Sequence, residues 1–67
     1  MTFDEALRWL DERGGRWTAS ANASACAVTV TLGTTKVRSQ AGELRADHVR
    51  SALVSAVLEL RGRAAAA

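Results

Sequence analysis

Apolar residues follow a helical spacing at both ends of the chain and an alternating spacing in its middle. In the first segment the apolar side chains recur every three or four positions, on one stripe of a helix: Phe3, Ala6, Leu7 and Leu10. Thr2 and Glu5 match a capping box, in which the Thr2 hydroxyl accepts from the Glu5 amide and the Glu5 carboxylate reaches back. The pattern predicts a helix that begins after Thr2 and ends at Gly14-Gly15.

The middle of the chain has the alternation that is typical of strands. In "CAVTVTL", residues 26–32, apolar side chains share one face and alternate with Ala and Thr on the other: Cys26, Val28, Val30 and Leu32. Residues 16–20 and 36–40 read as two shorter strands, separated from the first by polar turns around Asn22 and Gly33. The pattern predicts a three-stranded antiparallel sheet, with Trp17 anchored in the core and Cys26 a buried, inert thiol.

A second helix is predicted over residues 47–61, with Asp47 as its N-cap and Gly62 as its end. The order of elements is then α-β-β-β-α, an α+β fold. Because one face of the sheet is apolar and both helices are amphipathic, we expect the two helices to pack on that face. A single domain is expected over residues 1–62, followed by a disordered tail over residues 63–67.

The second helix carries more apolar residues than one face can bury. Val54 and Leu58 lie one turn apart on the side that faces away from the expected core, and Arg50 and Arg61 flank them. Such a pair beside arginines is typical of a helix-mediated contact, although single exposed apolar residues are also ordinary on protein surfaces. The pattern predicts a protein-binding surface made of these four residues, with paired helices in a homodimer as the favoured geometry.

The size of the chain and its residue counts favour association. A chain of 67 residues with one Cys and one His cannot form an internal disulfide or a Cys/His zinc site, and no cofactor is expected. A core this small only just offsets the entropy of the chain, so a partner would add stability. The sequence has no charged and apolar leader and no apolar run of roughly 18 to 20 residues, which indicates a cytoplasmic protein.

Two groups of residues are of types that occur in catalytic sites. His48 lies beside Asp47, with Ser51 one turn later, but neighbouring residues point in different directions on a helix and no oxyanion-type glycine turn adjoins Ser51. The acids of the first helix scatter around it, which indicates a solvated face and not a metal or acid–base site: Asp4, Asp11 and Glu12. We therefore expect no enzymatic activity.

The formal net charge is +2, and one set of basic residues forms an alternative binding surface: Arg16, Lys36, Arg38, Arg45 and Arg50. Together with the sheet threonines these residues could bind the phosphates of RNA or DNA, although the outer sheet positions hold no aromatic ring on which a base could stack. Trp9, at the border of the first helix, lies near enough to Arg13 in the sequence for a cation–π contact, and it is alternatively a candidate anchor for a protein partner.

The order of elements resembles the double-stranded-RNA-binding domain, whose second helix begins with lysines. Here that stretch is "ADHVR", where only Arg45 and Arg50 could substitute and Asp47 opposes their charge, and the family's Gly-Pro-x-His loop has no counterpart. The segments "ALRWLDERGGRW" and "HVRSALVSAVLEL" resemble the opening and closing elements of small phage-encoded ABA-sandwich domains, over about residues 5–60. That resemblance implies an accessory protein of a phage or mobile element and implies no site residues.

The sequence therefore predicts a non-enzymatic interaction module that binds a protein partner or itself through the outer face of the second helix. Binding of RNA or DNA at the basic surface is the alternative.

Overall fold

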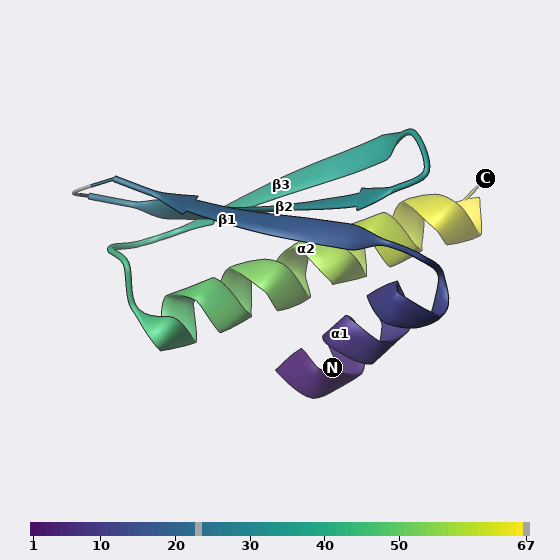
Figure 1. Ribbon diagram of the computed structural model, residues 1–67, viewed down its shortest axis with the longest axis horizontal. Coiled ribbons are helices and arrows are strands. Elements are labelled where there is room, and N and C mark those ends of the chain that lie inside the picture. The colour runs from purple at the N-terminus through teal and green to yellow at the C-terminus, as the bar shows by residue number, and fades with distance from the viewer. Residues whose placement is uncertain (23, 67) are drawn as a thin grey trace.

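Figure 1 shows the computed structural model of the chain, which describes residues 1–22 and 24–66. Its elements follow the order α1 (Phe3–Glu12), β1 (Arg16–Ala21), β2 (Cys26–Leu32), β3 (Thr35–Ala41) and α2 (Ala46–Ala66). The three strands form one antiparallel sheet with β2 in the centre, and both helices lie on the same side of it. The predicted α-β-β-β-α fold is confirmed.

Helix α1 begins with the predicted capping box. The Thr2 hydroxyl accepts from the Glu5 amide at 3.2 Å, and the Glu5 carboxylate accepts from the Thr2 amide at 3.4 Å. At the other end, Gly14 takes a φ of +69° and the Gly15 amide donates to the Leu10 carbonyl at 2.8 Å. These contacts satisfy backbone groups that a helix end otherwise leaves without partners.

We expect Thr2→Ala to lower the free energy of unfolding by about 1 kcal/mol, because it removes the acceptor for the Glu5 amide. The Thr2 side chain, and then its backbone amide, hold the pKa of the Glu5 carboxyl below its ordinary value. A lowered pKa stabilises the fold above the unfolded-state pKa, and this stability is lost as the pH falls through the folded-state pKa.

The difference between wild type and Thr2→Ala should therefore shrink in acid. Urea unfolding of both proteins near neutral pH and again below the pKa of Glu5 measures it, with Thr2→Ser as a control that keeps the cap. Equal stability of wild type and Thr2→Ala at neutral pH would refute a contribution from the capping box.

The strands are joined by tight turns that set their register. Leu32 pairs with Thr35, which leaves a two-residue turn in which Gly33 has a φ of +63°, as the first position of a type II′ turn requires. Between β1 and β2, the Asn22 side-chain oxygen accepts from the amides of Ser24 and Ala25, each at 3.0 Å. Both turns place inward-facing residues of neighbouring strands directly opposite one another.

The core lies between α2 and the strands β2 and β3. Its buried residues are small or aliphatic: Ala6, Leu10, Val28, Val30, Val37, Ala52, Leu53, Ala56, Val57 and Leu60. Cys26 is also buried, as predicted. None of the three aromatic side chains belongs to this set, since Phe3 and Trp9 only pack against its margin and Trp17 is exposed. The three aromatic side chains thus lie outside the fully buried core.

Helix α2 differs from the prediction at both ends. It begins at Ala46, where the Arg45 carbonyl accepts from the Val49 amide at 3.0 Å, so Asp47 lies within the first turn and is not the N-cap. It also continues through Gly62 to Ala66, because alanine is the strongest helix former and outweighs one glycine. Residues 63–66, where a disordered tail was predicted, therefore belong to α2, while residue 67 and the side chains of residues 64–66 lie outside the described part of the chain. No helix within the described ranges is long and apolar enough to span a membrane.

Candidate interaction surfaces

Strand β1 is left uncovered by the helices. All six of its residues are exposed. Trp17 is 40% exposed although its register partner on β2 is the buried residue Val30, which pairs in turn with the buried Val37 of β3. The prediction that Trp17 anchors the core is therefore wrong. The reason is that α2 packs over β2 and β3, whereas α1 packs mainly against the side of α2 and does not cover β1.

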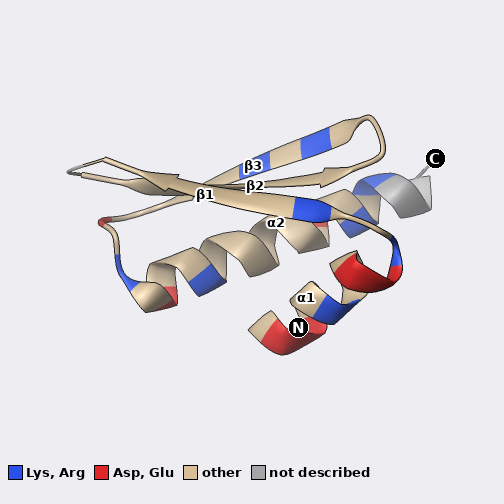
Figure 2. Cartoon of the chain, in the orientation of Figure 1, with Lys and Arg blue, Asp and Glu red and all other residues tan. Residues whose placement is uncertain are grey.

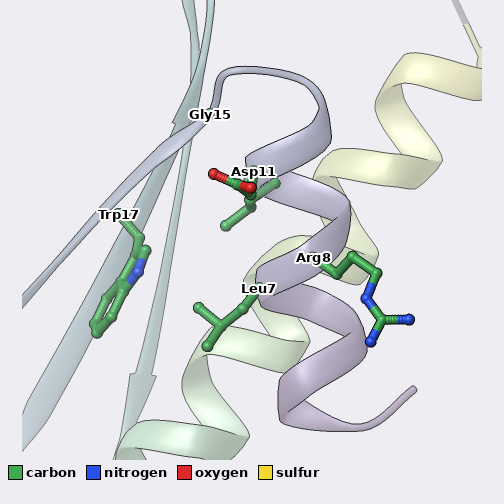
Figure 3. Close-up of a pocket in the computed structure, with 6 residues that line it drawn as sticks. Leu7, Arg8, Asp11, Gly15 and Trp17 are labelled. Carbon is green, nitrogen blue, oxygen red and sulfur yellow. The ribbon is translucent and has the colours of Figure 1, made fainter.

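An open groove of about 510 Å³ lies between α1 and β1 (Figure 3). Its lining residues are Leu7, Arg8, Leu10, Asp11, Gly15 and Trp17. In Figure 3 the side chains of Leu7 and Trp17 point toward one another across the groove, while Arg8 points away from it. The groove therefore has apolar walls and charged residues of both signs at its margin. Beyond Trp17, the inward positions of β1 hold only the small side chains of Ala19 and Ala21.

The two edges of the sheet differ in how they are protected against pairing with another strand. β1 carries one cation, Arg16, at its first position, and has no proline, acid or inward-facing charge. β3 carries two cations, Lys36 and Arg38, at its second and fourth positions. Because charged side chains along an edge discourage strand addition, β1 is the edge more open to a further strand.

The outer face of α2 is partly covered by α1. Val54 is half-buried and packs against the core, in a hollow that it shares with Met1 and Phe3. Arg50 lies over the Phe3 ring, with its guanidinium carbon 5.9 Å from the ring centre. Leu58 remains 46% exposed. Of the two surplus apolar residues predicted to form a surface, Val54 and Leu58, only Leu58 is therefore well exposed.

The remaining predicted protein-binding residues lie near the last turn of α1. The predicted cation–π contact is confirmed, since the Arg13 guanidinium carbon is 4.3 Å from the centre of the Trp9 ring. Arg13 also donates to the Trp9 carbonyl at 3.1 Å, which holds the cation above the ring. Trp9 is half-buried against the core, and Arg61 lines a shallow hollow beside it. Trp9 is thus held mainly by contacts within the chain.

The predicted nucleic-acid-binding residues divide between two sides of the molecule. Arg16 and Lys36 lie in one row across the outer face of the sheet, on either side of Thr31, and Arg38 lies in the next row. Figure 2 shows these cations on strands that carry no acidic residue. Arg45 and Arg50 lie elsewhere. Arg45 pairs with Asp47 at 3.2 Å before α2, and Arg50 lies over α1.

The side chains of Asp47, His48 and Ser51, whose residue types occur in catalytic triads, do not converge on one site. Asp47 pairs with Arg45, whereas His48 Nδ1 donates to the Glu43 carbonyl at 2.7 Å; since a carbonyl only accepts, the proton is on Nδ1. Ser51 is exposed. Among the described residues, no group of three or more His, Cys, Asp or Glu side chains is placed to hold a metal ion. The structure therefore places Asp47 and His48 where they organise the start of α2.

Comparison of this chain with known protein families, with curated proteins and with solved structures finds no match. The resemblances to phage-encoded ABA-sandwich domains and to the double-stranded-RNA-binding domain stay predictions, and the surfaces described above are the basis for a function.

Proposed function

We propose that this chain is a non-enzymatic interaction module that associates with a second copy of itself through the free edge of β1 and the adjoining α1–β1 groove. One observation carries the proposal: a complete edge strand is exposed, including Trp17, next to a groove with apolar walls. An edge strand offers unpaired backbone donors and acceptors, and a partly exposed tryptophan is a frequent anchor of protein contacts.

The charge pattern of β1 favours a second copy as the occupant. In a two-fold antiparallel pair centred on Thr18 or Ala19, Arg16 would lie opposite Ser20 or Asn22 of the second copy, so the two arginines stay at opposite ends of the shared ladder. The same pairing of β3 centred on Val37 would set Lys36 against Arg38. Like charges that lie directly opposite in a ladder are destabilising. Self-pairing is therefore compatible with β1 and opposed by β3.

The small core of the single chain is an energetic reason for two copies to associate. A chain of 67 residues buries only a modest fraction of its surface, and the buried core here contains none of the aromatic side chains. Two-fold pairing would extend the sheet to six strands and bring Trp17 of each copy into a more enclosed position. Because only the folded state can pair in this way, association would stabilise the fold by mass action.

The outer face of α2, predicted from the sequence, is the competing surface. Val54 is already half-buried beside Phe3, and a single exposed leucine such as Leu58 is ordinary. Both features favour β1 over α2 as the contact between copies.

We expect Ala19→Lys to separate the dimer into monomers. The substitution adds two like charges near the two-fold axis at a position that is exposed in the single chain. The dissociation constant should rise at least about tenfold, which corresponds to about 1.4 kcal/mol. Sedimentation equilibrium measures the change as a fall in mass from twice 7.1 kDa toward 7.1 kDa.

Two further variants serve as controls. Ala19→Thr adds a neutral β-branched side chain that suits a strand and should leave the mass unchanged. Leu58→Asp should also leave it unchanged, because the outer face of α2 lies outside the proposed contact. A wild-type mass of 7.1 kDa at every concentration would refute self-association, and dissociation by Leu58→Asp alone would place the contact on α2.

A further inference from the structure

The open face of the sheet is rich in hydrogen-bond donors. The register sets its nine outward residues in three rows: Arg16, Thr31 and Lys36; Thr18, Thr29 and Arg38; Ser20, Ala27 and Gln40. Every side chain in these rows except that of Ala27 carries an N–H or O–H donor. The three strands contain no Asp or Glu, so the face has no carboxylate of its own to neutralise it.

The three cations are close enough to act together. Strands lie about 4.8 Å apart and residues on one face about 7 Å apart, which sets the Cα atoms of Arg16 and Lys36 about 10 Å apart and those of Lys36 and Arg38 about 7 Å apart. These distances are close to the Debye length of about 8 Å at physiological salt, so the three potentials add at the surface. In the part of the chain that the structure describes, none of the three cations is in an ion pair.

A small polar hollow of about 150 Å³ marks one end of this face. It is lined by Ala27, which is 6% exposed, by Ser20, Arg38 and Gln40 of the same face, and by residues at and beside the β1–β2 turn: Ala21, Asn22, Ala25 and Cys26. Arg38 thus lines the hollow together with Ser20 and Gln40, two residues that carry neutral donors. Such a combination of charge and donors suits a phosphate group, which accepts several hydrogen bonds at once.

We propose that this face binds the phosphate backbone of a nucleic-acid duplex through Arg16, Lys36 and Arg38, with the threonine hydroxyls of β2 as further donors. A duplex is favoured over a single strand because the nine outward residues include no aromatic ring to stack a base. The inference does not rest on self-association, since the face lies on the side of the sheet away from the helices and the groove (Figure 1).

The experiment measures binding of a fluorescent DNA or RNA duplex by anisotropy at several salt concentrations. With three phosphate contacts, the slope of log affinity against log salt should be about −2.7, which is a loss of about fortyfold between about 50 and about 200 mM salt. Arg38→Gln should make the slope less steep by about a third, whether the protein is a monomer or a dimer. Arg38→Lys should retain the wild-type slope. Arg45→Gln is the matched control on the other side of the molecule and should leave it unchanged.

Four results would overturn the proposal. They are no binding at low salt, an equal effect of Arg45→Gln and Arg38→Gln, tighter binding of a single strand than of the duplex, and binding of poly-glutamate as tight as that of the duplex. The last result would assign the face to an acidic polypeptide. Because Arg38→Lys retains the charge at the same exposed position, it separates a lost phosphate contact from a damaged fold.

Discussion

Leu53→Ala is expected to remove much of the stability of this protein. Leu53 is fully buried on α2 at the centre of the core, where it packs over the sheet. Truncation of a buried leucine to alanine typically lowers the free energy of unfolding by about 2–5 kcal/mol, because it loses transfer energy and leaves a cavity. A domain of this length has in total about 3–10 kcal/mol. The variant should therefore be partly or wholly unfolded near room temperature.

Urea unfolding followed by circular dichroism measures this loss, at one fixed protein concentration because association adds stability. Leu44→Ala is the matched control, since Leu44 is 63% exposed in the loop before α2 and should change the stability by less than about 0.5 kcal/mol. Equal effects of the two substitutions would contradict the position of the core.

Gly15→Ala should have the second-largest effect, at the junction of α1 and β1. A Cβ atom at Gly15 would lie 2.8 Å from Leu10 Cδ2, 3.2 Å from the Leu10 carbonyl oxygen and 3.3 Å from the Thr31 carbonyl oxygen. Two of these neighbours are backbone atoms, so the added methyl must push β1 away from α1 or displace the buried Leu10. Overpacking of this kind costs about 1–3 kcal/mol, and it should also distort the groove that Gly15 helps to line.

Gly62→Ala is the matched control for this prediction. Gly62 lies within α2 with open space where a Cβ would be, so the same substitution should raise the free energy of unfolding by about 0.5–1 kcal/mol. Urea unfolding should thus give opposite signs for the two glycines. A neutral or stabilising Gly15→Ala would contradict the close contact of Gly15 with Leu10 and Thr31.

Structural features that depend only on residues close together in the sequence could be predicted. The capping box of Thr2 and Glu5 is set by four residues, and the alternation of Val28 and Val30 with threonines identifies the central strand without knowledge of the rest of the chain. The ends of α2 were harder to predict. Asp47 is a favourable N-cap and also a favourable first-turn residue, so its position alone does not fix the start of the helix.

The position of α1 relative to the sheet could not be predicted from the sequence. The apolar stripe of α1 shows that one face is buried, but not whether that face meets β1 or α2. In the structure it meets α2, which leaves Trp17 exposed and covers part of Val54. One signal was present: the inward positions of β1 after Trp17 are Ala19 and Ala21, side chains too small to hold a helix.

Only part of the basic surface could be predicted, because the rest again depends on how the chain is arranged in space. Alternation along each strand indicates that Arg16, Lys36 and Arg38 face outward, and the register brings these three together. Arg45 and Arg50 follow the sheet in sequence, but the chain crosses to the helical side before α2, which separates them from the other three. That separation depends on the course of the loop and makes Arg45 a useful control.

We propose that two copies of the chain meet at the uncovered strand β1. Isotope-filtered nuclear Overhauser spectroscopy on an equal mixture of labelled and unlabelled protein can detect this contact, because it reports contacts between copies alone. We expect contacts between copies at Thr18 and Ala19 and at the Trp17 ring, with none at Leu58. Contacts confined to Leu58 and its neighbours on α2, or a complete lack of contacts between copies at high concentration, would contradict the claim.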